Sequence, residues 1–203
     1  LGDVYKRQNQ AREDGATALF AAIATEQFTI VDLLLQNGAD INQAKHNGGT
    51  PILLAVRKTN LEIIDLLLQS GANVNQAAQD GTTALFIAAQ QGREDIVERL
   101  LENGADINFA KYDGATPLFI AANNGHIAVV ETLLAVPNID IHLKTYPGSK
   151  PWMDKTAREI AQSQGYNEIV KIIAAKQAQL QQELSYATAV SYTHLTLPTS
   201  FLV

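Results

Sequence analysis

Four histidines and a recurring set of aspartates are the residues of this chain that could do acid–base or metal chemistry. An imidazole paired with a carboxylate can act as a general base or help to ligate a metal ion. The histidines are scattered without the spacing of a ligand set: His46, His126, His142 and His194. The aspartates Asp40, Asp106 and Asp140 follow a repeating step, which indicates a role in a repeated turn. We expect no catalytic site and no metal site.

Glycine-rich segments and cysteines are the other features that could carry chemistry. The glycines form neither the motif GxxxxGK[ST] nor a GxGxxG motif that follows a strand, so no nucleotide-binding loop is predicted. The chain has no cysteine, which removes disulfides, thiolate zinc sites and a cysteine nucleophile together. We therefore expect a protein that is not an enzyme and that needs no cofactor.

Charge and hydrophobicity limit the partners and the location. Hydrophobic residues make up 46% and charged residues 18% of the 203 residues, a balance typical of folded globular proteins. The net charge of −6 argues against non-specific electrostatic binding to nucleic acid or anionic lipid. No run of about 18 apolar residues occurs, and the amino terminus lacks the apolar segment of a signal peptide. We expect a cytoplasmic protein with no membrane insertion; secretion as an effector stays open.

The elements that position all these residues repeat along the chain. Two kinds of residue recur every 33 positions: the glycines Gly15, Gly48, Gly81 and Gly114, and the threonines Thr17, Thr50, Thr83 and Thr116. Each threonine stands where a helix N-cap is needed, and Pro51 and Pro117 follow in the first turn. Apolar residues at helical spacing then predict a second helix that ends at Gly38, Gly71 or Gly104. A unit of this kind is stable only when it stacks on its neighbours.

The repeated lines DGATALFAA, NGGTPILLA, DGTTALFIAA and DGATPLFIAA, each followed by text such as LLLQNGADIN, resemble the ankyrin repeat. The resemblance covers residues 9–173 and implies an all-α solenoid with short β-hairpin fingers. Four regular repeats are expected at 14–46, 47–79, 80–112 and 113–145, and a degenerate fifth at 154–175. The family's usual histidine in TPLH is replaced here by Phe20, Leu53, Phe86 and Phe119. We expect apolar packing at these positions instead of imidazole hydrogen bonds.

The fifth repeat begins at Thr156, 40 residues after Thr116, so seven extra residues enlarge its finger, residues 144–153. This finger holds the single tryptophan of the chain, Trp152. Two interpretations stay open: Trp152 anchors a partner, as exposed tryptophans often do, or it folds back over the preceding finger.

The ends of the chain differ from the repeats. Residues 1–8 and 190–203 resemble translated cloning-adapter sequence, and we expect both to be non-native. The repeat phase runs back to Asn9, which favours an internal fragment of a longer array. Residues 174–189, rich in Ala, Gln and Leu, predict a helical extension that continues the last helix or covers the end of the stack.

Positions that vary between otherwise matching repeats are where a scaffold can carry specificity. At the finger tips these are Arg12, Glu13, Lys45, His46, Gln79, Lys111 and Tyr112. At the ends of the first helices they are Arg57, Lys58, Gln90, Gln91, Asn123 and Asn124. The ankyrin resemblance implies that both sets contact a protein partner on the concave face, and Trp152 is a further candidate contact. We expect a monomeric, non-catalytic interaction module; the alternative is a targeting segment of a larger enzyme or effector whose catalytic part lies elsewhere.

Overall fold

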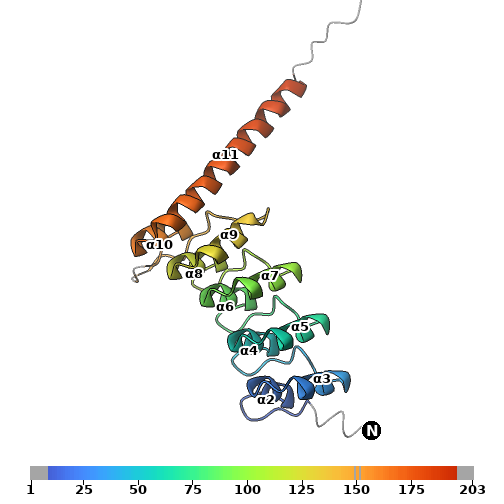
Figure 1. Cartoon of the computed structure of the whole chain (residues 1–203). Coiled ribbons are helices and arrows are strands. Elements are labelled where there is room, and N and C mark those ends of the chain that lie inside the picture. Colours follow the sequence, from blue (N-terminus) through green and yellow to red (C-terminus); the bar gives the residue numbers. More distant parts are fainter. Residues whose placement is uncertain (1–8, 149, 151, 196–203) are drawn as a thin grey trace, which may run out of the picture.

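The computed structural model is an elongated stack of helix pairs, described over residues 9–148, 150 and 152–195 (Figure 1). In each pair a short first helix is followed, after a tight turn, by a second helix that packs against it. The first helices are α2 (Ala18–Ala24), α4 (Pro51–Lys58), α6 (Ala84–Gln91), α8 (Pro117–Asn124) and α10 (Ala157–Gln164). The second helices are α3 (Phe28–Gln36), α5 (Leu61–Gln69), α7 (Glu94–Glu102), α9 (Ile127–Ala135) and α11 (Asn167–Leu195). Along the stack, first helices pack on first helices and second on second.

Threonine side chains start most of the first helices. The hydroxyls of Thr50, Thr83 and Thr116 accept a hydrogen bond from the backbone N–H three residues later, at 3.2–3.4 Å. Thr156 forms a full capping box with Glu159. Thr17 also occupies the N-cap of its helix, but its hydroxyl makes no cap hydrogen bond and is buried without a partner. The sequence pattern therefore located all five caps but not the missing bond at Thr17.

This difference gives a matched pair of substitutions. Thr83→Ala removes a buried cap bond and is expected to lower the free energy of unfolding by about 1 kcal/mol. Thr17→Ala removes a hydroxyl that has no partner to lose, so its effect is expected to be close to zero. Urea denaturation followed by circular dichroism at 222 nm measures both, and equal losses in the two variants would contradict the assignment.

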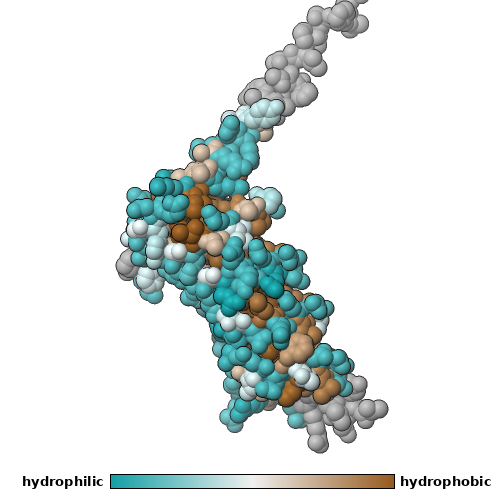
Figure 2. All heavy atoms as spheres, in the orientation of Figure 1, coloured by the Kyte–Doolittle hydropathy of each residue, from teal (hydrophilic) through white to brown (hydrophobic). Residues whose placement is uncertain are grey.

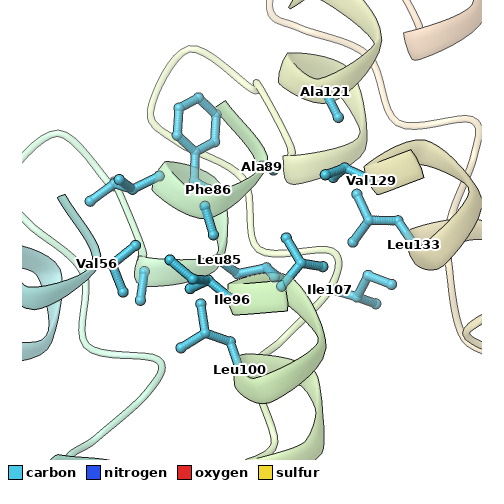
Figure 3. Close-up of a cluster of buried hydrophobic side chains, with 14 of the residues drawn as sticks. Val56, Leu85, Phe86, Ala89, Ile96, Leu100, Ile107, Ala121, Val129 and Leu133 are labelled. Atoms are coloured by element: carbon cyan, nitrogen blue, oxygen red, sulfur yellow. The ribbon is translucent and has the colours of Figure 1, made fainter. Parts of the chain in front are cut away.

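The core is continuous from one repeat to the next. Figure 3 shows side chains from neighbouring helix pairs that meet between the layers, among them Leu85, Ile96 and Leu133. These three are fully or almost fully buried. Because each layer is closed only by the layer before and the layer after it, stability is shared between neighbours along the stack.

The first helix pair is the exception, because one of its faces is uncovered in the described part of the chain. Ile30 on α3 is 48% exposed, and Leu33, one turn later, is 59% exposed. The residues at the same repeat position as Ile30, namely Ile63, Ile96 and Val129, are each 0% exposed because the preceding helix pair covers them. Figure 2 shows hydrophobic surface at the lower end of the stack, in the region of α3.

Two rows of hydrogen bonds connect consecutive repeats. In the first, the asparagine row, the side-chain oxygens of Asn9, Asn42, Asn75 and Asn108 accept from backbone N–H groups of the next repeat at 2.7–2.8 Å. In the second, the finger row, the backbone N–H groups of His46, Gln79, Tyr112 and Tyr146 donate to carbonyls of the preceding finger at 2.8–3.2 Å. Each interface between regular repeats therefore carries one bond of each row.

The fingers are tight turns in the part of the chain that the structure describes, not the paired strands of the expected β-hairpins. The second finger, for example, is closed by hydrogen bonds from Gly48 N–H to the Lys45 carbonyl and from Lys45 N–H to the Gly49 carbonyl. One antiparallel bridge, between Lys144 and Thr156, flanks the enlarged finger.

Helix α11 continues past the last repeat in one piece. Its 29 residues correspond to a length of about 43 Å, and it projects beyond the stack (Figure 1). Leu180 still packs against the core, whereas Leu184 and Tyr186 are exposed. The helix contains residues 174–189 and also 190–195, the start of the expected carboxy-terminal adapter. Residues 1–8 and 196–203, the rest of the two expected adapters, lie outside the described residues.

Candidate functional site

The side of the stack made by the finger tips and the first helices is called here the concave surface. It holds all of the variable positions selected from the sequence. The fingers are the turns at 12–15, 45–48, 78–81 and 111–114, together with the enlarged finger 144–153. Since the finger row and the packing of the first helices fix these elements, side chains on the concave surface project from a rigid support.

The charged residues at the finger tips fall into two groups: some are exposed, and others form ion pairs within the chain. Arg12, Glu13 and His46 are exposed. Lys45 is instead partnered within the chain, because its Nζ lies 2.7 Å from the Asp14 carboxylate and 5.8 Å from the centre of the Phe20 ring. Hydrogen bonding from Lys45 lowers the pKa of Asp14, so this ion pair is fully formed at neutral pH. Lys45 therefore has a partner within the chain and is less available to another molecule.

Lys111 repeats the arrangement two repeats later. Its Nζ lies 3.1 Å from the Asp80 carboxylate and 5.1 Å from the centre of the Phe86 ring. Burial alone would raise the pKa of Asp80, but hydrogen bonds from Thr82 and Lys111 outweigh it and lower the pKa. Beside Lys111, Tyr112 is 72% exposed and is the most prominent aromatic residue of the regular fingers.

The basic residues at the end of α4 remain exposed. The Arg57 side chain makes no hydrogen bond or ion pair with the described residues, and only its carbonyl is used. Lys58 has one distant ion pair, 4.0 Å from Glu26, between two well-exposed side chains. Such a pair contributes little, so both cations are available to another molecule.

Amide side chains follow the same edge in the next repeats, and most of them connect repeats. The side-chain amides of Gln79, Gln91 and Asn124 donate to the carbonyls of His46, Arg57 and Gln90 at 2.6–3.2 Å. Asn123 donates to Asn124 and accepts from Gln164. Gln90 differs, because its side-chain amide is exposed and makes no hydrogen bond with the described residues.

A cavity of about 270 Å³ opens on the concave surface between the fourth finger, the enlarged finger and helices α6 and α8. Four of the residues selected from the sequence line it: Gln90, Lys111, Asn123 and Trp152. The others that line it are Phe86, Asp113, Ala115, Phe119 and Ile120, which the sequence reasoning did not select as site residues. The sequence could have indicated two of them, because Phe86 and Phe119 occupy the same position in consecutive repeats, next to the enlarged finger.

The surroundings of Trp152 agree in part with each interpretation made from the sequence, an anchor for a partner and a residue that packs within the chain. Its carbonyl accepts a hydrogen bond from the Thr145 hydroxyl at 2.7 Å, which ties the enlarged finger to its own base. The Lys150 ammonium lies 5.0 Å from the centre of the ring system, within range of a cation–π contact. The residue remains 38% exposed and forms part of the cavity wall. Trp152 is thus packed along one side and accessible along the other.

Comparison with known families decides the identity of the stack. A family model described as ankyrin repeats, in three copies, matches residues 3–78 and 72–145, which is more than half of the chain. The chain belongs to the ankyrin-repeat family. Ankyrin repeats are generally protein–protein interaction modules, and the family is typically non-catalytic. A search of curated protein sequences finds none that matches this chain.

Within the ankyrin framework, the apolar residues at the usual histidine position are buried. Phe20, Leu53, Phe86 and Phe119 are at most 5% exposed. Two of these rings also carry a lysine from a finger, Lys45 over Phe20 and Lys111 over Phe86. This ankyrin chain therefore joins helix and finger by cation–π contacts at the positions where an imidazole would form hydrogen bonds.

The described part of this ankyrin chain contains no group of three or more histidine, aspartate or glutamate side chains that could hold a metal ion. In the same residues, no helix has both the length and the apolar character needed to cross a membrane. The concave surface thus offers hydrogen-bonding groups, exposed cations and an apolar cavity. These are the means to bind a partner.

Proposed function

We propose that this chain is a non-catalytic protein-interaction module that holds a segment of a partner protein on its concave surface. The observation that supports this most directly is the cavity lined by Gln90, Lys111, Asn123 and Trp152. Interface energy is usually concentrated in a few aromatic and arginine side chains around such a pocket.

The exposed groups around the cavity support the same proposal. Arg57, Gln90 and Tyr112 present a guanidinium, an amide and a phenol to solvent, and none of these three polar groups bonds to the described residues. Because the chain carries a net charge of −6, exposed cations on this one surface favour a partner segment that is acidic.

A triple substitution on the concave surface tests the proposal. In Arg57→Ala/Lys58→Ala/Tyr112→Ala, the captured partner is expected to bind at least about tenfold more weakly, a loss of roughly 1.4 kcal/mol. All three side chains are exposed, so the thermal midpoint is expected to change by no more than about 3 °C. The measurement is affinity capture by the full chain, then titration of the captured protein by isothermal calorimetry.

The matched control carries the same kinds of change away from the finger tips and the variable ends of the first helices; the Arg158 side chain, at the start of α10, donates instead to Gln177 on α11. Arg158→Ala/Lys171→Ala/Tyr186→Ala removes one arginine, one lysine and a tyrosine that is as exposed as Tyr112, 73% against 72%. This control variant is expected to bind like the unmodified chain. A captured protein that binds both triple variants equally well would exclude the concave surface as its site.

A further inference from the structure

The cavity on the concave surface has the size and lining for one uncharged side chain. Its volume of about 270 Å³ lies below the roughly 300–1,000 Å³ usual for sites that hold a whole small molecule. Three buried apolar residues line it: Phe86, Ala115 and Phe119. At its edge two cations, Lys111 and Lys150, stand against two carboxylates, Asp80 and Asp113, so the local charge is balanced. A charged side chain would be desolvated there without a net counter-charge beside it.

Of the two amide side chains at the rim of the cavity, one is free to bond a partner. The amide of Asn123 is used at both ends, since it donates to Asn124 at 2.9 Å and accepts from Gln164 at 3.2 Å. The amide of Gln90 has no hydrogen-bond partner among the described residues and can both donate and accept. A peptide backbone in extended conformation presents the complementary N–H and C=O groups.

A guanidinium without an ion-pair partner in the described residues lies one repeat away, toward the first repeat. Arg57 in the second repeat occupies the same repeat position as Gln90 in the third, 33 residues later. Their helices α4 and α6 pack side by side, and helices in such contact are about 8–10 Å apart. An extended chain advances about 3.3 Å per residue, so one repeat step corresponds to about three residues. Because the cavity lies between Gln90 and Asn123, Arg57 is about three to five residues of extended chain from it.

We propose that the partner segment is a short extended peptide that inserts one apolar side chain into the cavity formed by Phe86, Phe119 and Trp152. It places a carboxylate three to five residues away, in salt bridge with Arg57, while Gln90 hydrogen-bonds its backbone between these points. A planar guanidinium binds a carboxylate through two parallel hydrogen bonds, which makes Arg57 selective for an acidic residue. This inference rests on the proposed function and specifies the chemistry of the partner.

The test uses a random library of twelve-residue peptides displayed on phage and selected on the immobilised full chain. The expected consensus has an aliphatic or phenylalanine side chain and an aspartate or glutamate three to five positions away. A synthetic peptide of that consensus, free of tryptophan, is then titrated by fluorescence anisotropy. Trp152 is the single tryptophan of the chain, so entry of an apolar side chain is also expected to shift its emission to shorter wavelength.

Two substitutions separate the two contacts. Gln90→Trp fills the mouth of the cavity from an exposed position, and it is expected to weaken the peptide at least tenfold, whereas Gln69→Trp on exposed α5 surface has no effect. Arg57→Glu is expected to weaken the same peptide at least tenfold, and a peptide with lysine in place of its acidic residue restores binding to that variant. Restoration by the reversed charge identifies a direct pairing.

The outcomes distinguish this inference from the proposed function. Peptides that bind the Arg57/Lys58/Tyr112 triple variant weakly need the concave surface. If such peptides still bind normally to both Gln90→Trp and Arg57→Glu, the inference is overturned and the proposed function stands. A consensus that lacks the apolar and acidic pair would do the same. A selection that yields no peptide, or only peptides that bind the triple variant as well as the unmodified chain, counts against both.

Discussion

Ile96→Ala is expected to lower the free energy of unfolding by about 2–4 kcal/mol, while Ile30→Ala is expected to cost at most about 1 kcal/mol. The two isoleucines have the same repeat position on their second helices, 66 residues apart. Ile96 is 0% exposed between the third helix pair and the one before it, so its truncation leaves a cavity. Ile30 is 48% exposed on the uncovered face of the first pair, where solvent replaces the lost atoms.

Chemical denaturation of the full chain by urea, followed by far-ultraviolet circular dichroism, measures this difference. Ile63, fully buried at the same position in the second repeat, provides the internal control, and Ile63→Ala is expected to resemble Ile96→Ala. Comparable losses at Ile30 and Ile96 would mean that the first helix pair is covered in solution by something that the described residues do not include.

Gly48→Ala is expected to destabilise the stack by about 1–3 kcal/mol more than Gly71→Ala. Both glycines have positive φ, +77° and +88°, so alanine meets a similar backbone strain of about 1–2 kcal/mol at each. They differ in their surroundings. A Cβ on Gly48 would lie 2.5 Å from the backbone nitrogen of Gln79 in the next finger, whereas a Cβ on Gly71 would have nothing within 4 Å.

The difference between these two variants therefore isolates the close packing of one finger on the next. Thermal unfolding of both proteins, each compared with the unmodified chain, gives the two losses under the same conditions. If Gly71→Ala is as destabilising as Gly48→Ala, backbone strain alone accounts for both, and the contact between fingers contributes nothing measurable.

The repeat architecture was readable from the sequence because its determinants are local and recur. Thr50, Thr83 and Thr116 each cap a helix within three residues, and the family match confirms the repeat assignment. The missing bond at Thr17 could not be read, because that threonine has the same local sequence context as the others. Unlike theirs, its hydroxyl makes no cap hydrogen bond, and the residue types of the repeat do not predict this difference.

The candidate site was only partly predictable, for two reasons. The partners of Lys45 and Lys111 lie 31 residues earlier, at Asp14 and Asp80, so variability alone selected these lysines without indicating that each has an ion-pair partner within the chain. A search for opposite charges one repeat apart would have found both pairs. The cavity could not be predicted, because its wall includes Trp152 from an insertion whose path no other repeat copies.

The asparagine row and the finger row are two separate lines of attachment along the stack, with one bond of each at every interface between regular repeats. Two parallel lines of attachment resist twisting, because rotation of one repeat on its neighbour must stretch bonds in at least one row. Each interface carries its own bonds, so removal of a single asparagine side chain, such as Asn75, would loosen one interface and leave the bonds at the others in place. The stiffness of the surface offered to a partner can therefore be altered one repeat at a time.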